Sequence, residues 1–147
     1  MRQGTKYFGL LYTKTKNFVL CGYSYVDFSR SIDDWASTLG YLMNMGSAVV
    51  SWSCKKQATV ATSPAEAEYI SAWEAACETV WLRRILQDLE ISQAKATSLF
   101  TDSQSAIKLA KNPAFHWKTK HVDTKYHHIR PLIAKKVLKP IYCPSED

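Results

Sequence analysis

Residues 63–107 read SPAEAEYISAWEAACETVWLRRILQDLEISQAKATSLFTDSQSAI, and this stretch decides the fold. Ser63 suits an N-cap, Pro64 suits the first helical position, and Glu66 follows three residues after the cap, as in a capping box. Apolar residues then recur at helical spacing as far as Leu89. The pattern predicts one long helix whose apolar positions include Ile70, Trp73, Cys77, Val80, Trp81 and Ile85.

The end of the same stretch predicts a strand followed by a helix. Ala96–Thr101 is a short apolar strand, and Asp102 stands at its C-terminal end. Ser103–Lys111 has the character of a second helix, which ends before Pro113 because the residue before a proline disfavours helical geometry.

Upstream, four apolar segments are typical of strands. Tyr7–Tyr12 and Phe18–Val26 are separated by the turn TKTKN. Leu39–Asn44 and Ala48–Ser53 flank Met45-Gly46-Ser47, which predicts a hairpin.

Downstream, two prolines interrupt the expected elements. A third helix is expected over Thr119–Lys136, where Pro131 would break or kink it. Val137–Cys143 is a candidate last strand, which Pro140 confines to a sheet edge or leaves irregular. The order of elements, an antiparallel meander and then alternating helices and strands, predicts an α/β fold with a mixed sheet.

The chain has 147 residues, 46% of them hydrophobic and 12% aromatic. This composition predicts a single folded domain over residues 1–147. No segment approaches the roughly 18 apolar residues of a membrane span, so we expect no membrane partner.

The four cysteines are scattered, without a C-x-x-C pair, and are expected to be free thiols in a reducing compartment. We therefore expect an intracellular protein of the cytoplasm or nucleus. Mitochondrial targeting stays open, since Arg2, Lys6, Lys14 and Lys16 precede the first acidic residue, Asp27.

The formal net charge of +6 is concentrated in the C-terminal third. Such a cluster is typical of a phosphate-binding surface, and equally of a solvated lysine-rich helix. Its basic residues are Lys111, Lys118, Lys120, Lys125, Arg130, Lys135, Lys136 and Lys139.

Two carboxylates are the candidates for chemistry. Asp102 ends a strand and Glu68 lies in the second turn of the long helix, so the two can converge at one corner of an α/β sheet. Each has a simpler interpretation: Glu68 as an acid favoured by the helix dipole, and Asp102 as the N-cap of the next helix.

The amino-acid sequence around these acids closely resembles the ribonuclease H domain of copia-type retrotransposon polyproteins. The resemblance runs in order over nearly the whole chain, and its most distinctive motifs are SWSCKKQ, AEAEY, TDSQSAI and KTKHVD. It implies a ribonuclease H-like fold, with a mixed five-stranded sheet whose first three strands are antiparallel and whose faces carry helices. It also implies an ancestral Mg-dependent cleavage of the RNA strand of RNA-DNA hybrids, in which four carboxylates bind two Mg²⁺ ions.

Carried onto this chain, the resemblance assigns the helix acid to Glu68 and the second strand acid to Asp102. The first acid belongs to the family pattern G-Y-S-D-A-D, and the corresponding residues of this chain are GYSYVD. Tyr25 therefore stands at that ligand position, and Asp27 is a conceivable substitute. The fourth acid lies in a family segment beyond PSED, which this chain lacks because it ends at Asp147. Glu68 and Asp102 are therefore expected to hold one Mg²⁺ at most, and weakly.

These departures predict a degenerate ribonuclease H-like domain without nuclease activity, acting as a binding module. The surface expected to bind an RNA-DNA hybrid or duplex nucleic acid contains Lys55, Lys56, Lys118, Lys120, His121 and Lys125. Two alternatives are an active Mg-dependent ribonuclease H and a domesticated module that binds an unknown protein.

Overall fold

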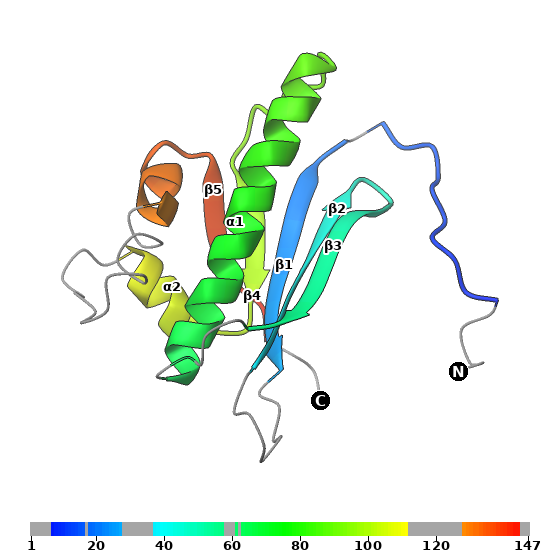
Figure 1. Ribbon diagram of the computed structural model, residues 1–147. Helices are drawn as coiled ribbons and strands as arrows, with labels where there is room; N and C mark the ends of the chain where they lie inside the picture. The colour runs from blue at the N-terminus through cyan, green and yellow to red at the C-terminus, as the bar shows by residue number, and fades with distance from the viewer. Residues whose placement is uncertain are drawn as a thin grey trace.

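The computed structural model describes residues 7–16, 18–27, 37–57, 61, 63–111 and 128–144. Strands and helices alternate in the second half of the chain, as Figure 1 shows. Residues 128–134 are also helical. The elements in chain order are β1 (Leu20–Asp27), β2 (Thr38–Met45), β3 (Ala48–Lys56), α1 (Pro64–Asp88), β4 (Thr97–Thr101), α2 (Gln104–Lys111) and β5 (Leu138–Tyr142).

The strands form one mixed sheet in the order β3-β2-β1-β4-β5. β1 pairs antiparallel with β2, and β2 pairs antiparallel with β3. β4 is parallel to β1, and β5 is parallel to β4. The β2–β3 hairpin turns at Gly46, whose φ of 64° lies in the left-handed region that glycine adopts without steric cost. The predicted mixed five-stranded sheet with three antiparallel strands is confirmed.

The helices pack on one face of this sheet (Figure 1). α1 begins as predicted, because the Ser63 side chain accepts a hydrogen bond of 3.2 Å from the Glu66 backbone N–H. A core cluster joins Tyr69 of α1 to Leu99 of β4, Leu109 of α2 and Ile129 of the 128–134 helix. All three helices are thereby placed on the same side of the sheet.

The face of α1 that contacts the sheet is built from small residues. Ala67, Ala75 and Ala76 are fully buried, whereas Trp81 is 54% exposed. Trp81 recurs at helical spacing with the other apolar positions of α1, but it does not belong to the core. Alanine side chains let the helix approach the strands closely, and the large side chain is left at its margin.

The opposite face of the sheet carries a row of apolar side chains. Cross-strand register places Trp52, Leu42, Tyr23, Phe100 and Ile141 side by side across all five strands. The described helices leave this row uncovered, since they pack on the other face. We call these five residues the apolar row.

The N-terminal segment differs from the sequence prediction. Residues 7–12 adopt no strand, and their side chains are exposed. Phe18 and Val19 also precede the first strand, which starts at Leu20. In Figure 1 the segment runs out beyond the β2–β3 hairpin.

The third predicted helix is confirmed only in part. Residues 128–134 are helical through Pro131, and the Lys135 N–H donates to the Pro131 carbonyl at 2.9 Å. Of the expected break or kink at Pro131, the break is therefore wrong for this stretch. The predicted residues 119–127 lie outside the described part of the chain.

The last strand, β5, lies at the sheet edge, as Pro140 predicts. The Cys143 N–H donates to the Thr101 carbonyl at 2.9 Å, so odd-numbered residues here direct their N–H groups toward β4. The nitrogen of Pro140 therefore faces outward. The proline removes one donor from the outer edge and none from the β4–β5 ladder.

Candidate functional site

Asp102 immediately follows β4, as predicted, and is exposed. It does not cap α2, because that role belongs to Ser103. The Ala106 N–H donates to the Ser103 Oγ at 3.0 Å, and the Ile107 N–H donates to the Ser103 carbonyl at 3.3 Å. The interpretation of Asp102 as a helix cap is therefore wrong.

Glu68 is tied to the same corner of the sheet. It lies in the second turn of α1, and the Ser103 hydroxyl donates to its carboxylate through a short hydrogen bond. The acid of the first turn of α1 is Glu66. One serine thus joins the start of α2 to the carboxylate of α1, next to Asp102.

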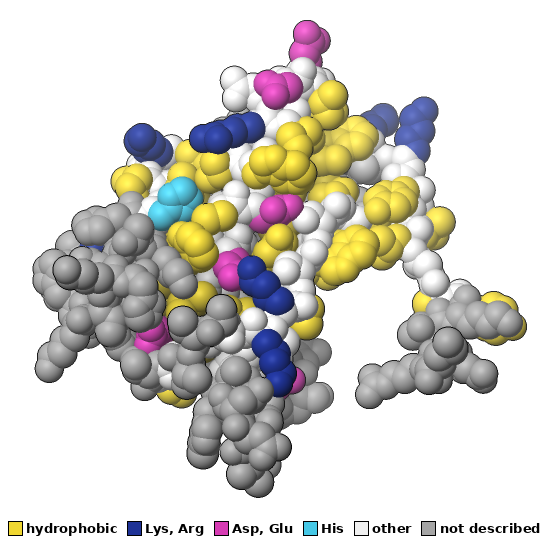
Figure 2. Space-filling view, viewed as in Figure 1, with side chains coloured by type: hydrophobic (Ala, Val, Ile, Leu, Met, Phe, Trp, Pro, Cys, Tyr) yellow, Lys and Arg dark blue, Asp and Glu magenta, His cyan; other side chains and the backbone are white. Residues whose placement is uncertain are grey.

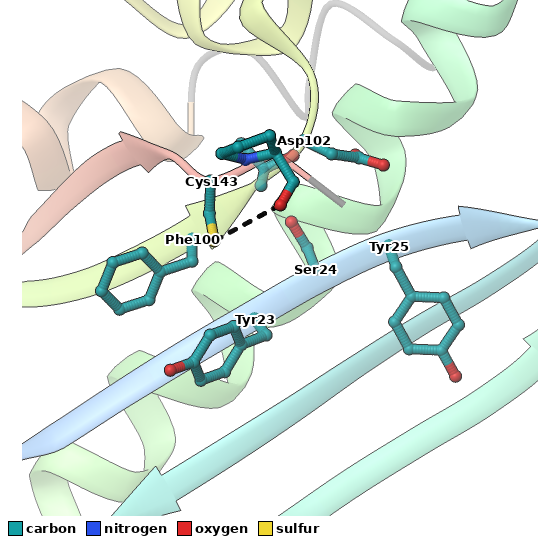
Figure 3. Close-up of a pocket in the computed structure, with 8 residues that line it drawn as sticks. Tyr23, Ser24, Tyr25, Phe100, Asp102 and Cys143 are labelled. Atoms are coloured by element: carbon teal, nitrogen blue, oxygen red, sulfur yellow. Dashed lines mark hydrogen bonds between the residues drawn. The ribbon is translucent and has the colours of Figure 1, made fainter. Parts of the chain in front are cut away.

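Tyr25 lies near Asp102 but its hydroxyl points elsewhere. Both residues line a pocket of about 180 Å³ at the C-terminal ends of β1 and β4. Figure 3 shows the phenol of Tyr25 directed away from Asp102. Its ring lies over Gly40 of β2.

The pKa of Tyr25 is raised. Hydrogen bonding to the Cys54 side chain is the main cause, and burial, the Cys54 charge and the Asp27 charge add to it. Tyr25 is therefore a neutral phenol at neutral pH, engaged with β3 rather than with the two acids.

Asp27, the conceivable substitute, ends β1 two residues further on. Alternation puts it on the same face as Tyr25, and it pairs in register with Thr38. It is not among the residues that line the pocket with Asp102. The role of Asp27 as a substitute ligand stays a prediction.

The predicted basic surface is divided by the sheet. Lys55 faces α1, where its ammonium lies 3.1 Å from the Glu74 carboxylate. Lys56, the next residue of β3, points to the opposite face by strand alternation. The other predicted members, Lys118, Lys120, His121 and Lys125, lie outside the described residues.

Sequence reasoning missed three features of this corner. Ser103 is the link between Glu68 and α2. Tyr23 and Phe100 stack on the pocket floor with ring centroids 5.0 Å apart (Figure 3). Cys143, just after β5, lines the same pocket. The alternation of residues in LCGYSYVD could have indicated that Tyr23 and Tyr25 share one face of the strand. The position of Cys143 depends on the pairing of β5 with β4.

The described donor set does not fit a pair of divalent cations. Two cations about 4 Å apart need several carboxylates, and among the described residues this corner offers Glu68 and Asp102. Glu68 already accepts a hydrogen bond from Ser103, and the Tyr25 oxygen is turned away. Within the described ranges, no three His, Cys, Asp or Glu side chains are grouped so as to hold a metal.

The described helices include none that is long and apolar enough to cross a membrane. The cysteines Cys21, Cys54, Cys77 and Cys143 are free thiols in the structure.

Comparison with known proteins places this chain among transposon polyproteins. The retrovirus-related Pol polyprotein from transposon TNT 1-94 of Nicotiana tabacum is 44% identical over 129 residues, which cover 88% of this chain. That from transposon RE1 of Arabidopsis thaliana is 33% identical over 144 residues, or 98% of this chain. The chain spans about 10% of the length of each. No family model matches.

Among solved structures, the fold is similar to that of LC11-RNase H1 in complex with an RNA/DNA hybrid. The TM-score is 0.57 at 12% identity, and the match covers 85% of each chain. The strand order and the mixed sheet described above agree with this likeness. By sequence and by fold, the chain belongs to the ribonuclease H-like domains of retrovirus-related Pol polyproteins from copia-type transposons.

Proposed function

We propose that this domain binds nucleic acid without cleaving it. The observation that carries the proposal is the orientation of Tyr25, which stands at the expected position of the first metal-binding carboxylate. Its phenol points away from Asp102 (Figure 3) and hydrogen-bonds with the Cys54 side chain. A neutral oxygen turned away from Glu68 and Asp102 supplies neither charge nor a ligand there.

Loss of this carboxylate affects both cations of a two-metal site at once. A bridging carboxylate neutralises and positions two ions, so its removal weakens the binding of each. The remaining pair, Glu68 and Asp102, is suited to one weakly held Mg²⁺ at most. Phosphodiester hydrolysis that depends on two ions is therefore not expected.

The net charge of the chain and its structural similarity to a ribonuclease H support nucleic-acid binding. The chain carries a net charge of +6, which attracts a polyanion irrespective of its sequence. LC11-RNase H1, whose fold is similar, is a protein solved with an RNA/DNA hybrid. Lysines bind phosphate groups without a carboxylate cluster, so nucleic-acid binding can be retained after catalysis is lost.

A cleavage and binding experiment tests the two halves separately. A labelled RNA-DNA hybrid is incubated with Mg²⁺ or Mn²⁺, and its affinity for the domain is measured over a range of salt concentrations. We expect no cleavage, and an affinity that falls steeply as salt rises. Cleavage that Glu68→Gln abolishes would establish the alternative of an active ribonuclease H, and an affinity independent of salt would contradict binding to the phosphate backbone.

A restoring substitution sharpens the test. Tyr25→Asp returns a third carboxylate to the corner that holds Glu68 and Asp102, and Tyr25→Asn is its uncharged control of the same size. We expect Mn²⁺ affinity, measured by calorimetry, to rise at least roughly tenfold for Tyr25→Asp alone, because each added carboxylate strengthens a divalent site. Equal affinity in both variants would show that Tyr25 is not at a ligand position.

A second candidate function is protein binding through the apolar row. Trp52 is 64% exposed and Tyr23 is 40% exposed, and uncovered apolar surface of this kind is typical of interaction sites. Trp52→Ser should abolish association with a partner if this function holds. Unchanged hybrid binding in the same variant would separate the two functions.

A further inference from the structure

The N-terminal segment, residues 7–12, is an apolar run without a place in the core. It reads YFGLLY, and Tyr7 is 92% exposed, Phe8 80% and Leu11 76%. A Cβ atom built at Gly9 would meet nothing within 4 Å. A continuous apolar run is typical of a strand covered on both faces, not of a solvated chain.

The unpaired side of β3 lies beside this segment. Among the described strands, β3 is the end strand of the sheet, with β2 on one side only. An end strand presents backbone groups to which a further strand can pair. The opposite end strand, β5, carries Pro140, whereas β3, with the sequence AVVSWSCKK, contains no proline.

Contacts already hold the segment at one end of β3. The Tyr12 hydroxyl donates to the Val49 carbonyl at 2.7 Å. The Thr13 N–H donates to the Ser47 Oγ at 3.0 Å, and that hydroxyl donates back to the Thr13 carbonyl at 3.2 Å. The segment is thus fixed beside the β2–β3 turn, from which residues 7–11 extend.

The chain direction suits an antiparallel pairing. From the anchor at the turn, β3 runs from Ala48 toward Lys56, while the N-terminal segment runs from Thr13 back toward Tyr7. Laid along β3, the segment would be antiparallel to it. Because the anchor lies within the same molecule, the effective concentration of the segment at this edge is high.

Exposed aromatic side chains flank β3 on both faces of the sheet. Trp52 stands on the face of the apolar row, and Trp81 borders the groove between α1 and β3 on the other face. Figure 2 shows hydrophobic side chains gathered beside α1 on the side of the β2–β3 hairpin. Alternate residues of a strand at this edge would cover both tryptophans.

We propose that residues 7–12 bind the free edge of β3 in the same molecule as a sixth, antiparallel strand. An antiparallel register with Tyr12 opposite Val49, the residue that its hydroxyl contacts, would bring Tyr7 opposite Cys54. The pairing shields the edge of β3 from other chains. It is independent of nucleic-acid binding, so either proposal can fail alone.

Disulfide trapping in the full chain tests the pairing. Tyr7→Cys and Phe8→Cys are oxidised separately under mild conditions, each with a Cys54→Ser counterpart as control. We expect one of the two positions to form an intramolecular disulfide with Cys54 at least roughly tenfold faster than the other, because neighbouring strand residues face opposite ways. Tyr7→Cys should form the disulfide faster if the new pairing is regular. Phe8→Cys should form it faster if the register shift at Met43/Asn44 carries over to the new strand.

Two results would overturn the proposal. Equal or absent trapping at both positions would show that the segment does not pair with β3. A disulfide-linked dimer would show that the edge receives the segment of another copy.

Hydrogen exchange supplies an independent measurement. Leu10→Pro removes a backbone N–H and Leu10→Ala keeps it, while both lose the leucine side chain. The amides of Trp52 and Cys54 should exchange at least roughly tenfold faster in the proline variant than in the alanine variant. Identical exchange in both would count against the sixth strand.

Discussion

The aromatic ring of Tyr25 on β1 lies directly over Gly40, its antiparallel partner on β2. The ring occupies the space that any side chain at position 40 would need. Because Gly40 has no side chain, the phenol packs against β2 as part of the sheet rather than protruding from it.

This packing predicts the effect of Gly40→Ala. The new Cβ would overlap the Tyr25 ring, and the ring must move for the strand to stay paired. We expect a loss of about 1–3 kcal/mol in the free energy of unfolding, the usual cost of overpacking, measured by urea denaturation.

The control for this prediction is the double variant Gly40→Ala with Tyr25→Ala. With the ring absent, the added methyl group meets no obstacle from Tyr25. The cost of Gly40→Ala should then fall to within about 0.5 kcal/mol. An undiminished cost in the Tyr25→Ala background would place the strain elsewhere.

Ser103→Ala should destabilise the corner that holds the two acids. The variant loses the cap of α2 and the donor to the Glu68 carboxylate. Loss of a helix cap alone lowers the free energy of unfolding by about 1 kcal/mol. We expect a total loss of about 1–3 kcal/mol, measured by thermal and urea unfolding. Asp102→Asn is the matched control, since this exposed neighbour caps nothing and should change stability by no more than about 0.5 kcal/mol.

Alkaline pH should weaken the fold through its tyrosines. The pKa values of Tyr25 and Tyr41 are raised above the ordinary 10.0, mainly by hydrogen bonding to Cys54 for Tyr25 and by burial for Tyr41. Above pH 10.0 the unfolded chain releases these protons first, so unfolding becomes more favourable as pH rises. The urea midpoint should therefore fall in this range, and less steeply in Tyr25→Phe. An identical slope in that variant would show that Tyr25 does not contribute.

The small-residue face of α1 predicts that substitution of an alanine in this helix destabilises the protein more than substitution of a tryptophan. Ala75→Leu inserts a large side chain where there is no exposed surface and should cost about 1–3 kcal/mol or more. Trp81→Ala should cost well under the roughly 3–5 kcal/mol typical of a buried tryptophan, because Trp81 is more than half exposed. Calorimetric unfolding of the two variants compares them directly, and a larger loss for Trp81→Ala would contradict the assigned face.

Local chemistry was sufficient to predict α1, the β2–β3 hairpin and the edge position of β5. Ser63 and Pro64 mark a helix start irrespective of tertiary context, and Gly46 supplies the turn. The same reasoning failed for residues 7–12. Their apolar composition predicts a strand, but pairing requires a partner edge that only the assembled sheet defines.

The sequence indicates Glu68 and Asp102 as candidate site residues, but it does not indicate their contacts. Glu68 and Asp102 were identified from their positions at a helix start and a strand end. The link made by Ser103 was not, because its hydrogen bond to Glu68 connects elements 35 residues apart in the chain. Similarly, nothing in the sequence indicates that the Tyr25 phenol reaches Cys54 across β2.

The outward nitrogen of Pro140 makes the two flanks of the sheet unequal. A molecule of this kind can accept a strand along β3 and offers an incomplete set of donors along β5. Stacking in an endless row requires that every copy join neighbours on both flanks. Because Pro140 leaves the β5 flank short of one donor, growth of such a row through β5 is disfavoured, which guards a basic, aromatic-rich domain against fibrils.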